Sequence, residues 1–197
     1  MPTTRVRIGP ADAGRAMTLD EFREADVVEG YRYELARGIL EVNAIPKTPH
    51  RRVVSKLFEL AALYKASHPG VIDYFGGGTE VRAWIASADL ARHPDFGVVF
   101  RGAGTDPEGD LKPGLFAEVV SPSSKVRDYE HKRRDYLEYG VAEYWIVDPQ
   151  ERLVTVLVRQ GEGDAAWVER VFRDDEVIES PALPGLNVAV EELWQGL

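Results

Sequence analysis

The chain has 197 residues, of which 44% are hydrophobic and 29% charged, and it carries a formal net charge of −9 at pH 7 with no cysteine. This length is sufficient for one domain with a substantial core, and the absence of cysteine excludes disulfides and thiolate zinc sites, so any metal site must use carboxylates. The acidic balance argues against a broadly basic surface for gripping nucleic acid, although it leaves room for a local basic patch.

The N-terminal part gives no sign of a targeting sequence. Residues 1–16 are polar, contain no apolar stretch of the kind found in a secretory signal, and predict a flexible segment before a single domain over residues 17–197. No apolar run approaches the roughly 20 residues of a membrane span, so we expect a cytoplasmic protein. Thr18-Leu-Asp-Glu21 fits the capping box that begins a helix. Tyr31–Leu35 and Gly38–Val42 flank a short connection and predict a β-hairpin.

The middle of the chain predicts one long helix followed by apolar strands and a second helix. Apolar residues recur at helical spacing between His50 and His68, where Pro69-Gly70 ends the helix. Serines at 121–124 can cap a further helix from about Lys125 to Tyr139, closed by Gly140. Four runs have the composition of strands: Glu80–Ile85, Phe96–Phe100, Leu115–Val120 and Tyr144–Asp148. A helix between the last two strands normally makes them parallel neighbours in one sheet.

The C-terminal third predicts antiparallel strands and a short final helix. Strand character is found in Leu153–Arg159, Trp167–Phe172 and Glu176–Glu179, and Glu191-Glu-Leu-Trp194 begins the helix. The elements together predict an α/β fold of the α+β type, with a central mixed β-sheet flanked by helices.

Glu118 is the first residue that suggests chemistry. It lies in the middle of the apolar run Leu115–Val120, on the same strand face as Phe116 and Val120. An unpaired buried carboxylate is costly, so a glutamate is kept there only where a cation, a metal or hydrogen-bond donors meet it. The alternative is a glutamate at a strand end that pairs with an arginine.

Asp95 becomes a candidate metal ligand when it is considered together with Glu118. It follows Pro94 and opens the strand Phe96–Phe100, and in isolation Pro-Asp is typical of a turn. Two carboxylates on neighbouring strands can share one hard cation such as Mg²⁺ or Mn²⁺. We therefore expect Asp95 and Glu118 to form a metal-binding pair.

Lys132 is the third candidate. At about 100° per residue it falls within the same arc of its helix as Tyr129, Tyr136 and Tyr139, which is the apolar arc. A lysine in that arc either extends past the tyrosines to solvent or places its ammonium beside Glu118.

Several short motifs have, taken together, the residue types and spacing of a known family. They are, in chain order, Tyr33-Glu-Leu, Pro94-Asp95, Glu118-Val-Val-Ser-Pro-Ser-Ser, Asp128 with Lys132 and Tyr136, and Gly140-Val-Ala-Glu-Tyr-Trp-Ile-Val-Asp148. In these residues the sequence resembles the Uma-two family of restriction endonucleases, over residues 17 to about 195. Members are placed in the PD-(D/E)XK nuclease superfamily, whose sheet presents a metal-binding Asp, a metal-binding Glu and a catalytic Lys. The resemblance therefore implies a restriction-endonuclease-like core.

The resemblance implies that Asp95 and Glu118 bind the metal and that Lys132 supplies the catalytic ammonium. In the usual superfamily pattern the lysine follows the glutamate by two residues on the same strand, where this chain has Val120. The lysine would thus be displaced from the strand to the next helix, a placement that agrees with its position on the helical wheel.

Two further residues enter through the resemblance. It implies that Glu34 is an additional catalytic acid near the metal, whereas its place in the predicted hairpin also suits an exposed side chain. His50 corresponds to a family histidine, with helix capping or a surface position as the alternative.

The implied reaction is hydrolysis of a phosphodiester, with DNA as the expected substrate. Bound Mg²⁺ or Mn²⁺ would polarise a phosphate oxygen and activate water, while Lys132 orients that water or stabilises developing charge. A homodimer is favoured because cutting both strands calls for two sites. Four basic residues lie in the helix expected from about Lys125 to Tyr139 and are candidates for phosphate binding: Lys125, Arg127, Arg133 and Arg134. Acidic residues of the same helix lower the local positive charge.

Two other classes of function stay open. The acidic charge favours a non-catalytic module that keeps the nuclease fold but binds or regulates a partner. A metal hydrolase for a small phosphorylated substrate would also suit the acidity, but the sequence lacks a phosphate-binding glycine loop, since Gly76-Gly77-Gly78 precedes a strand and indicates a flexible turn. Metal binding through Asp95 and Glu118 separates the nuclease from the binding module.

Overall fold

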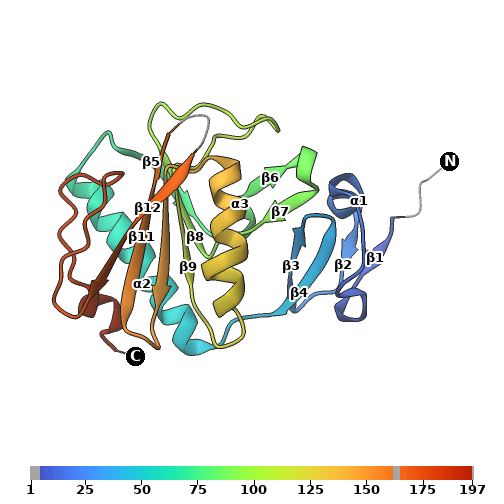
Figure 1. Ribbon diagram of the computed structural model, residues 1–197, viewed down its shortest axis with the longest axis horizontal. Helices are drawn as coiled ribbons and strands as arrows, with labels where there is room; N and C mark the ends of the chain where they lie inside the picture. Colours follow the sequence, from blue (N-terminus) through green and yellow to red (C-terminus); the bar gives the residue numbers. More distant parts are fainter. Residues whose placement is uncertain (1–4, 162–164, 197) are drawn as a thin grey trace. The chain divides into compact units, whose positions relative to one another are not determined.

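The computed structural model describes residues 5–161 and 165–196, whose contacts group into two compact units. Unit 1 comprises Met1–Pro46 and Arg82–His93, and unit 2 comprises Lys47–Val81 and Pro94–Leu197. Figure 1 labels the helices and strands of both. The single domain expected over residues 17–197 stays a prediction, because a grouping of contacts does not decide whether the units fold independently.

The described part of unit 1 contains a four-stranded antiparallel sheet with the order β4-β3-β7-β6. Its strands are β3 Tyr31–Ala36, β4 Ile39–Ala44, β6 Ala83–Ile85 and β7 Leu90–Arg92. The predicted hairpin is β3–β4, turned by Arg37 and Gly38 at φ of 51° and 77°. The predicted capping box begins α1, Leu19–Glu24, where the Glu21 N–H donates to Thr18 Oγ1 at 3.2 Å and the Thr18 N–H to Glu21 Oε2 at 2.7 Å.

Described residues 5–16 differ from the expectation of a flexible lead-in over residues 1–16, whose first four residues lie outside the described part of the chain. Arg7–Ile8 form the short strand β1, which pairs in parallel with β2, Asp26–Val27. The Ile8 side chain is fully buried in an apolar cluster of unit 1. A single apolar residue held by pairing with a distant strand leaves no periodic signal in a polar segment, which is why composition alone did not predict it.

Among the described residues of unit 2, a six-stranded sheet has the strand order β12-β11-β10-β9-β8-β5. Neighbours β9 and β10 run parallel, and the other neighbouring pairs run antiparallel. This mixed sheet confirms the expected fold class and the expected parallel pairing. The bounds are β5 Ile72–Gly76, β8 Phe96–Phe100, β9 Leu115–Val119, β10 Glu143–Asp148, β11 Leu153–Gln160 and β12 Ala166–Arg173.

Two helices cover opposite faces of this sheet, as Figure 1 shows. The long predicted helix is α2, Thr48–Ser67, which buries its apolar side in one cluster with Ala117 and Val119 of β9. The other face carries Phe116, whose ring centroid lies 4.8 Å from that of Tyr136 in α3, Lys132–Tyr139. Because side chains alternate along a strand, Glu118 shares the α3 face with Phe116.

Four predicted elements differ from the structure. The helix expected from Lys125 does begin there, but it contains a π-helical turn at Arg127–His131 before it continues as α3 at Lys132. The strand expected at Glu176–Glu179 is reduced to a bridge between Val177 and Ala189, and the final helix is a 3₁₀ turn, Val190–Trp194. The first part of the strand expected from Glu80 belongs to another 3₁₀ turn, Gly78–Glu80.

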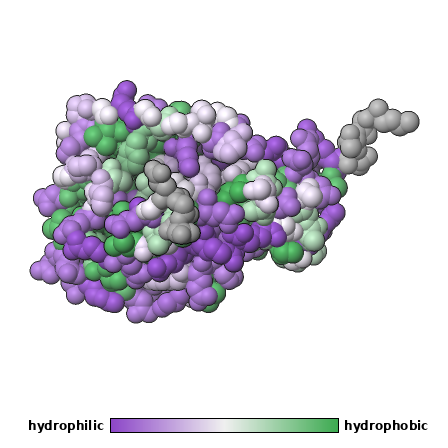
Figure 2. Space-filling model, turned by 45° about the horizontal axis from the view of Figure 1, so that its top comes forward, coloured by the Kyte–Doolittle hydropathy of each residue, from purple (hydrophilic) through white to green (hydrophobic). Residues whose placement is uncertain are grey.

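The surface visible in Figure 2 is mainly hydrophilic, and its hydrophobic residues form small separate groups. Scattered surface hydrophobics of this kind are normal for folded proteins. Within residues 5–161 and 165–196, no helix combines the length and apolar character needed to cross a bilayer.

Candidate active site

Asp95 and Glu118 lie where the pairing between β8 and β9 ends. β8 begins at Phe96, which pairs with Ala117, so the next step in the same register sets Asp95 opposite Glu118. Residues directly opposite each other in antiparallel strands have Cβ atoms about 4.5–5.5 Å apart. Asp95 is 8% exposed and Glu118 is 2% exposed. Two buried carboxylates on adjacent strands thus form the centre of the candidate site.

The main chain holds Asp95 from two sides. The Val119 N–H donates to Asp95 Oδ2 at 2.9 Å and so gains a side-chain acceptor where the ladder has ended. Gly77 packs against the Asp95 backbone, because a Cβ built at Gly77 would lie 2.5 Å from the Asp95 carbonyl oxygen. The glycine run at residues 76–78, which the sequence indicated as a flexible turn, therefore permits a close backbone approach that places Asp95.

Glu118 is held by two donors from α3. The ammonium of Lys132 donates to Glu118 Oε1 at 2.8 Å, and the hydroxyl of Tyr136 donates to the same oxygen at 2.5 Å. Lys132 is 3% exposed and Tyr136 is fully buried. The ammonium thus lies beside Glu118, as one of the two alternatives from the helical wheel proposed, and not at the surface. Its catalytic role stays a prediction.

The π-helical turn before α3 brings a third carboxylate, Asp128, into the interior. Asp128 is 2% exposed and lies four residues before Lys132, on the same side of the helix. Burial raises the pKa of the Asp128 carboxyl, while the positive charge of Lys132 and a hydrogen bond with Ser124 oppose that rise. π-helical turns recur at functional sites. From the sequence, Asp128 was recognised only as a member of the family motif. Its four-residue spacing from Lys132 is the signal that could have placed both side chains on one side of the helix.

His50 also reaches the site, from the first turn of α2. Its Nε2 lies 2.9 Å from Asp95 Oδ2, and its side chain is 13% exposed. The two residues are 45 positions apart, and no local sequence pattern predicts such a contact. The sequence alone therefore could not decide between a role implied by the family resemblance and a capping or surface position for His50.

Glu34 belongs to unit 1, where it lies on β3 and is 3% exposed. Its Oε2 accepts from the Arg92 guanidinium at 3.3 Å, and its Oε1 accepts from the His93 N–H at 2.9 Å. The exposed position considered for Glu34 is therefore wrong. Its role as a further acid near the metal stays a prediction.

The residues suggested for phosphate binding each face an acid. Lys125 Nζ lies 2.8 Å from Glu151 and Arg133 Nη1 lies 2.7 Å from Glu169, while Arg127 Nε is 3.8 Å from its neighbour Asp128. To contact a phosphate, each of these side chains would have to leave its acidic partner or bind both groups at once.

The donor chemistry of the site suits Mg²⁺ or Mn²⁺. Asp95 and Glu118 offer hard oxygen ligands, and Mg²⁺ is usually bound through one or two carboxylates with water and substrate phosphate completing its shell. Within the described residues, no group of three or more His, Asp or Glu side chains is arranged to enclose a metal ion. A cation held by Asp95 and Glu118 would therefore need water or substrate oxygens to complete its shell.

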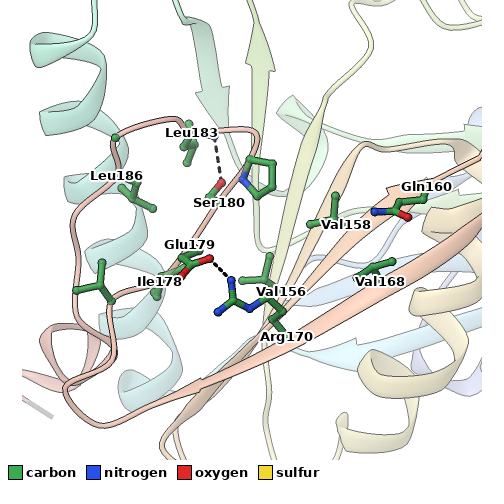
Figure 3. Close-up of a pocket in the computed structure, with 13 residues that line it drawn as sticks. Val156, Val158, Gln160, Val168, Arg170, Ile178, Glu179, Ser180, Leu183 and Leu186 are labelled. Carbon is green, nitrogen blue, oxygen red and sulfur yellow. Dashed lines mark hydrogen bonds and ion pairs between the residues drawn. The ribbon is translucent and has the colours of Figure 1, made fainter.

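A separate cavity of about 450 Å³ lies on the α2 side of the sheet, between β11, β12 and the C-terminal segment (Figure 3). Val156, Val158 and Ile178 supply apolar walls, and Arg170 forms an ion pair with Glu179 at its edge. Glu118 projects from the opposite face of the sheet. Among its described lining residues, this cavity has one acid, Glu179, which is already ion-paired, and so no carboxylate pair for a metal.

Comparison with known proteins supports a nuclease fold. A search of curated proteins finds no match. Among solved structures, the crystal structure of a "putative nuclease belonging to DUF820" from Anabaena variabilis is similar, with a TM-score of 0.70 and 21% identity over 90% of this chain and 97% of that chain. At that identity the likeness shows the fold alone. The profile of the Uma2 family, described as "Putative restriction endonuclease", matches residues 19–191. Since this match spans most of the sequence, including every candidate site residue, the chain belongs to the Uma2 family.

Proposed function

We propose that the protein is an endonuclease that hydrolyses phosphodiester bonds of DNA and depends on Mg²⁺ or Mn²⁺. Membership of a family described as restriction endonucleases supports a nuclease role. The observation that carries the finer proposal is the buried arrangement of Asp95, Glu118 and Lys132 at the end of the β8–β9 ladder.

The roles of the side chains follow from this arrangement. Asp95 and Glu118 would hold the divalent cation, which when bound polarises a phosphate oxygen and lowers the pKa of water. Lys132 supplies a positive charge in an interior where electrostatic interactions are stronger than in water. Its ammonium is kept there by Glu118 Oε1 and is in place to orient the attacking water or to stabilise charge on the phosphate.

DNA is proposed as the substrate because restriction enzymes act on it, and two sites are needed to cut both of its strands, which favours a homodimer. Lys125, Arg127 and Arg133 would contact phosphates by exchanging their present acidic partners. Dimerisation and a cytoplasmic location remain predictions.

A non-catalytic binding module is the second candidate function. It is favoured by the net charge of −9 and by the internal pairing of the site, in which Lys132 contacts Glu118 and His50 contacts Asp95. Such pairing would let the fold persist without a metal. Binding of Mn²⁺ by the purified protein separates the two functions.

Plasmid nicking tests the nuclease proposal. We expect the wild type to nick supercoiled plasmid with Mg²⁺ or Mn²⁺ and to stop when EDTA is added. Asp95→Asn removes a metal ligand at constant volume, and Lys132→Met removes the ammonium, so each should lower the rate by about 100-fold or more. The rate is measured from the conversion of supercoiled to open-circular DNA.

The matched control is Asp174→Asn, which makes the same chemical change at an exposed turn in unit 2. This variant should nick as fast as the wild type. Equal rates for all four proteins would assign the cleavage to a contaminant, and an inactive wild type that also fails to bind Mn²⁺ would favour the binding module.

A further inference from the structure

His50 is largely shielded from solvent, whereas a capping or surface histidine would be exposed. The residue before α2, Lys47, makes no side-chain capping bond, and His50 lies in the first turn with its side chain 13% exposed. Its ring does not cap the N-terminal N–H groups of α2, and little of it is exposed to solvent. Neither of the two ordinary roles for a histidine at this position accounts for the burial.

The polar contact of the imidazole is with Asp95. Nε2 lies 2.9 Å from Asp95 Oδ2, while Nδ1 is buried and has no hydrogen-bond partner within the described residues. Burying a ring nitrogen without a partner has a cost. The ring is therefore placed for its contact with Asp95 at the expense of its other nitrogen.

The same oxygen of Asp95 also accepts from the Val119 N–H at 2.9 Å. The terminal torsion of an aspartate is soft and has a broad distribution. Two donors that converge on Oδ2 from different elements, α2 and β9, restrict that torsion and fix the plane of the carboxylate.

We propose that His50 is a positioning residue that orients the Asp95 carboxylate for a divalent cation. The inference rests on the proposed function, because it takes Asp95 as a metal ligand. Groups that hold a metal ligand by hydrogen bonds commonly account for 10- to 100-fold in metal affinity. His50 itself is not required to touch the metal or the substrate.

The experiment measures Mn²⁺ binding without DNA, from the electron paramagnetic resonance signal of free Mn²⁺. His50→Phe and His50→Ala both remove the donor, the first while keeping a ring, and His50→Gln keeps an N–H donor. We expect the Kd for Mn²⁺ to rise about tenfold in both donor-free variants and to stay within about threefold of the wild type in His50→Gln. Thermal melts check that each variant is folded.

His68→Phe is the matched control. His68 stacks on Tyr64 with ring centroids 4.2 Å apart, near the far end of α2, so a phenyl ring preserves its contact and should leave the Kd unchanged. As a second measurement, the Mn²⁺ concentration for half-maximal nicking should rise in His50→Phe, with the rate at saturating Mn²⁺ within about threefold of the wild type. A purely structural role of His50 would not separate those two quantities.

The outcomes distinguish failure of this inference from failure of the proposed function. A wild type that binds Mn²⁺, together with folded donor-free variants that bind it equally well, overturns the role of His50 alone. Weak binding by His50→Gln equal to that of His50→Ala also overturns it, since the donor would then be irrelevant. A wild type that does not bind Mn²⁺ overturns both proposals.

Discussion

Lys132 and Glu118 form an ion pair in which each side chain is 3% exposed. Taking two charges out of water is expensive, and their attraction offsets that cost only while both partners are present. Tyr136 adds a neutral donor to the same Glu118 oxygen and cannot replace the missing positive charge. Replacing only one member of the pair should therefore lower the stability of unit 2, because the other charge is then buried without its partner.

A double-mutant cycle tests this dependence in the presence of EDTA. Lys132→Met should lower the free energy of unfolding by about 3 kcal/mol, because it leaves the Glu118 carboxylate buried without its cation. Adding Glu118→Gln should restore part of that loss, because the remaining buried carboxyl near Lys132, Asp128, still lacks the cation. Urea unfolding followed by circular dichroism gives both values, and additive losses in the double variant would contradict the interpretation.

The residues of the site differ in how far sequence reveals them. Glu118 and Lys132 could be identified because each is a charged residue at a position that its own strand or helix marks as buried. Asp95 could be identified as a site residue only in combination with Glu118. The contact of His50 with Asp95 joins α2 to the start of β8 and depends on how elements pack, which no local periodicity encodes.

At the scale of elements, segments with a clear apolar pattern of their own were predicted well, and segments without such a pattern were predicted poorly. The helix α2 and the strands β8 to β11 follow from apolar patterns that their own residues carry. β5, at one edge of the sheet, is five residues long and was not predicted, and the π-helical turn keeps a helical pattern while changing its hydrogen bonding. Such features are decided by tertiary packing, which overrides weak local preference.

The C-terminal segment is attached to the sheet through Glu143, at the start of β10. The Glu143 carboxylate accepts from the Trp145 indole at 2.5 Å, the Ser180 hydroxyl at 2.6 Å and the Ala182 N–H at 3.0 Å. Burial raises the pKa of Glu143 above the ordinary value of a glutamate, and the three donors oppose the rise only in part. Folding thus makes Glu143 easier to protonate than it is in the unfolded chain.

This pKa shift predicts a pH dependence of stability. A carboxyl whose pKa is higher in the folded than in the unfolded state contributes stability below the unfolded value, and that contribution is lost as pH rises through the folded value. Glu143→Gln has no proton to lose. The Tm of the wild type minus that of Glu143→Gln should therefore be larger at pH 4.5 than at pH 8, measured by calorimetry. A constant difference would contradict the shift.

At the scale of the whole molecule, the negative charge is unevenly distributed between the two units. Unit 1 contains eight arginines and nine acids, so most of the net charge of −9 belongs to unit 2, which carries the candidate site. Electrostatic attraction to phosphates drives most nonspecific binding to DNA. In the proposed function, unit 2 would therefore rely on bound cations to bring a phosphate close to Asp95 and Glu118.

DNA affinity should accordingly depend on a divalent ion. In EDTA at about 0.15 M salt we expect no saturable binding of a labelled duplex, measured by fluorescence anisotropy. Ca²⁺, a hard cation that also takes carboxylate oxygens, should produce binding in the wild type and in Asp174→Asn but not in Asp95→Asn. Tight binding in EDTA would show that a basic surface suffices without the metal pair.

The hydrogen bond from the Val119 N–H to Asp95 Oδ2 links a backbone amide directly to a predicted metal ligand. The nuclear magnetic resonance frequency of an amide proton is sensitive to the charge of the group that accepts it. An isotope-labelled protein thus carries a built-in reporter at position 119, whose signal follows the state of the Asp95 carboxylate while every side chain of the site remains unaltered.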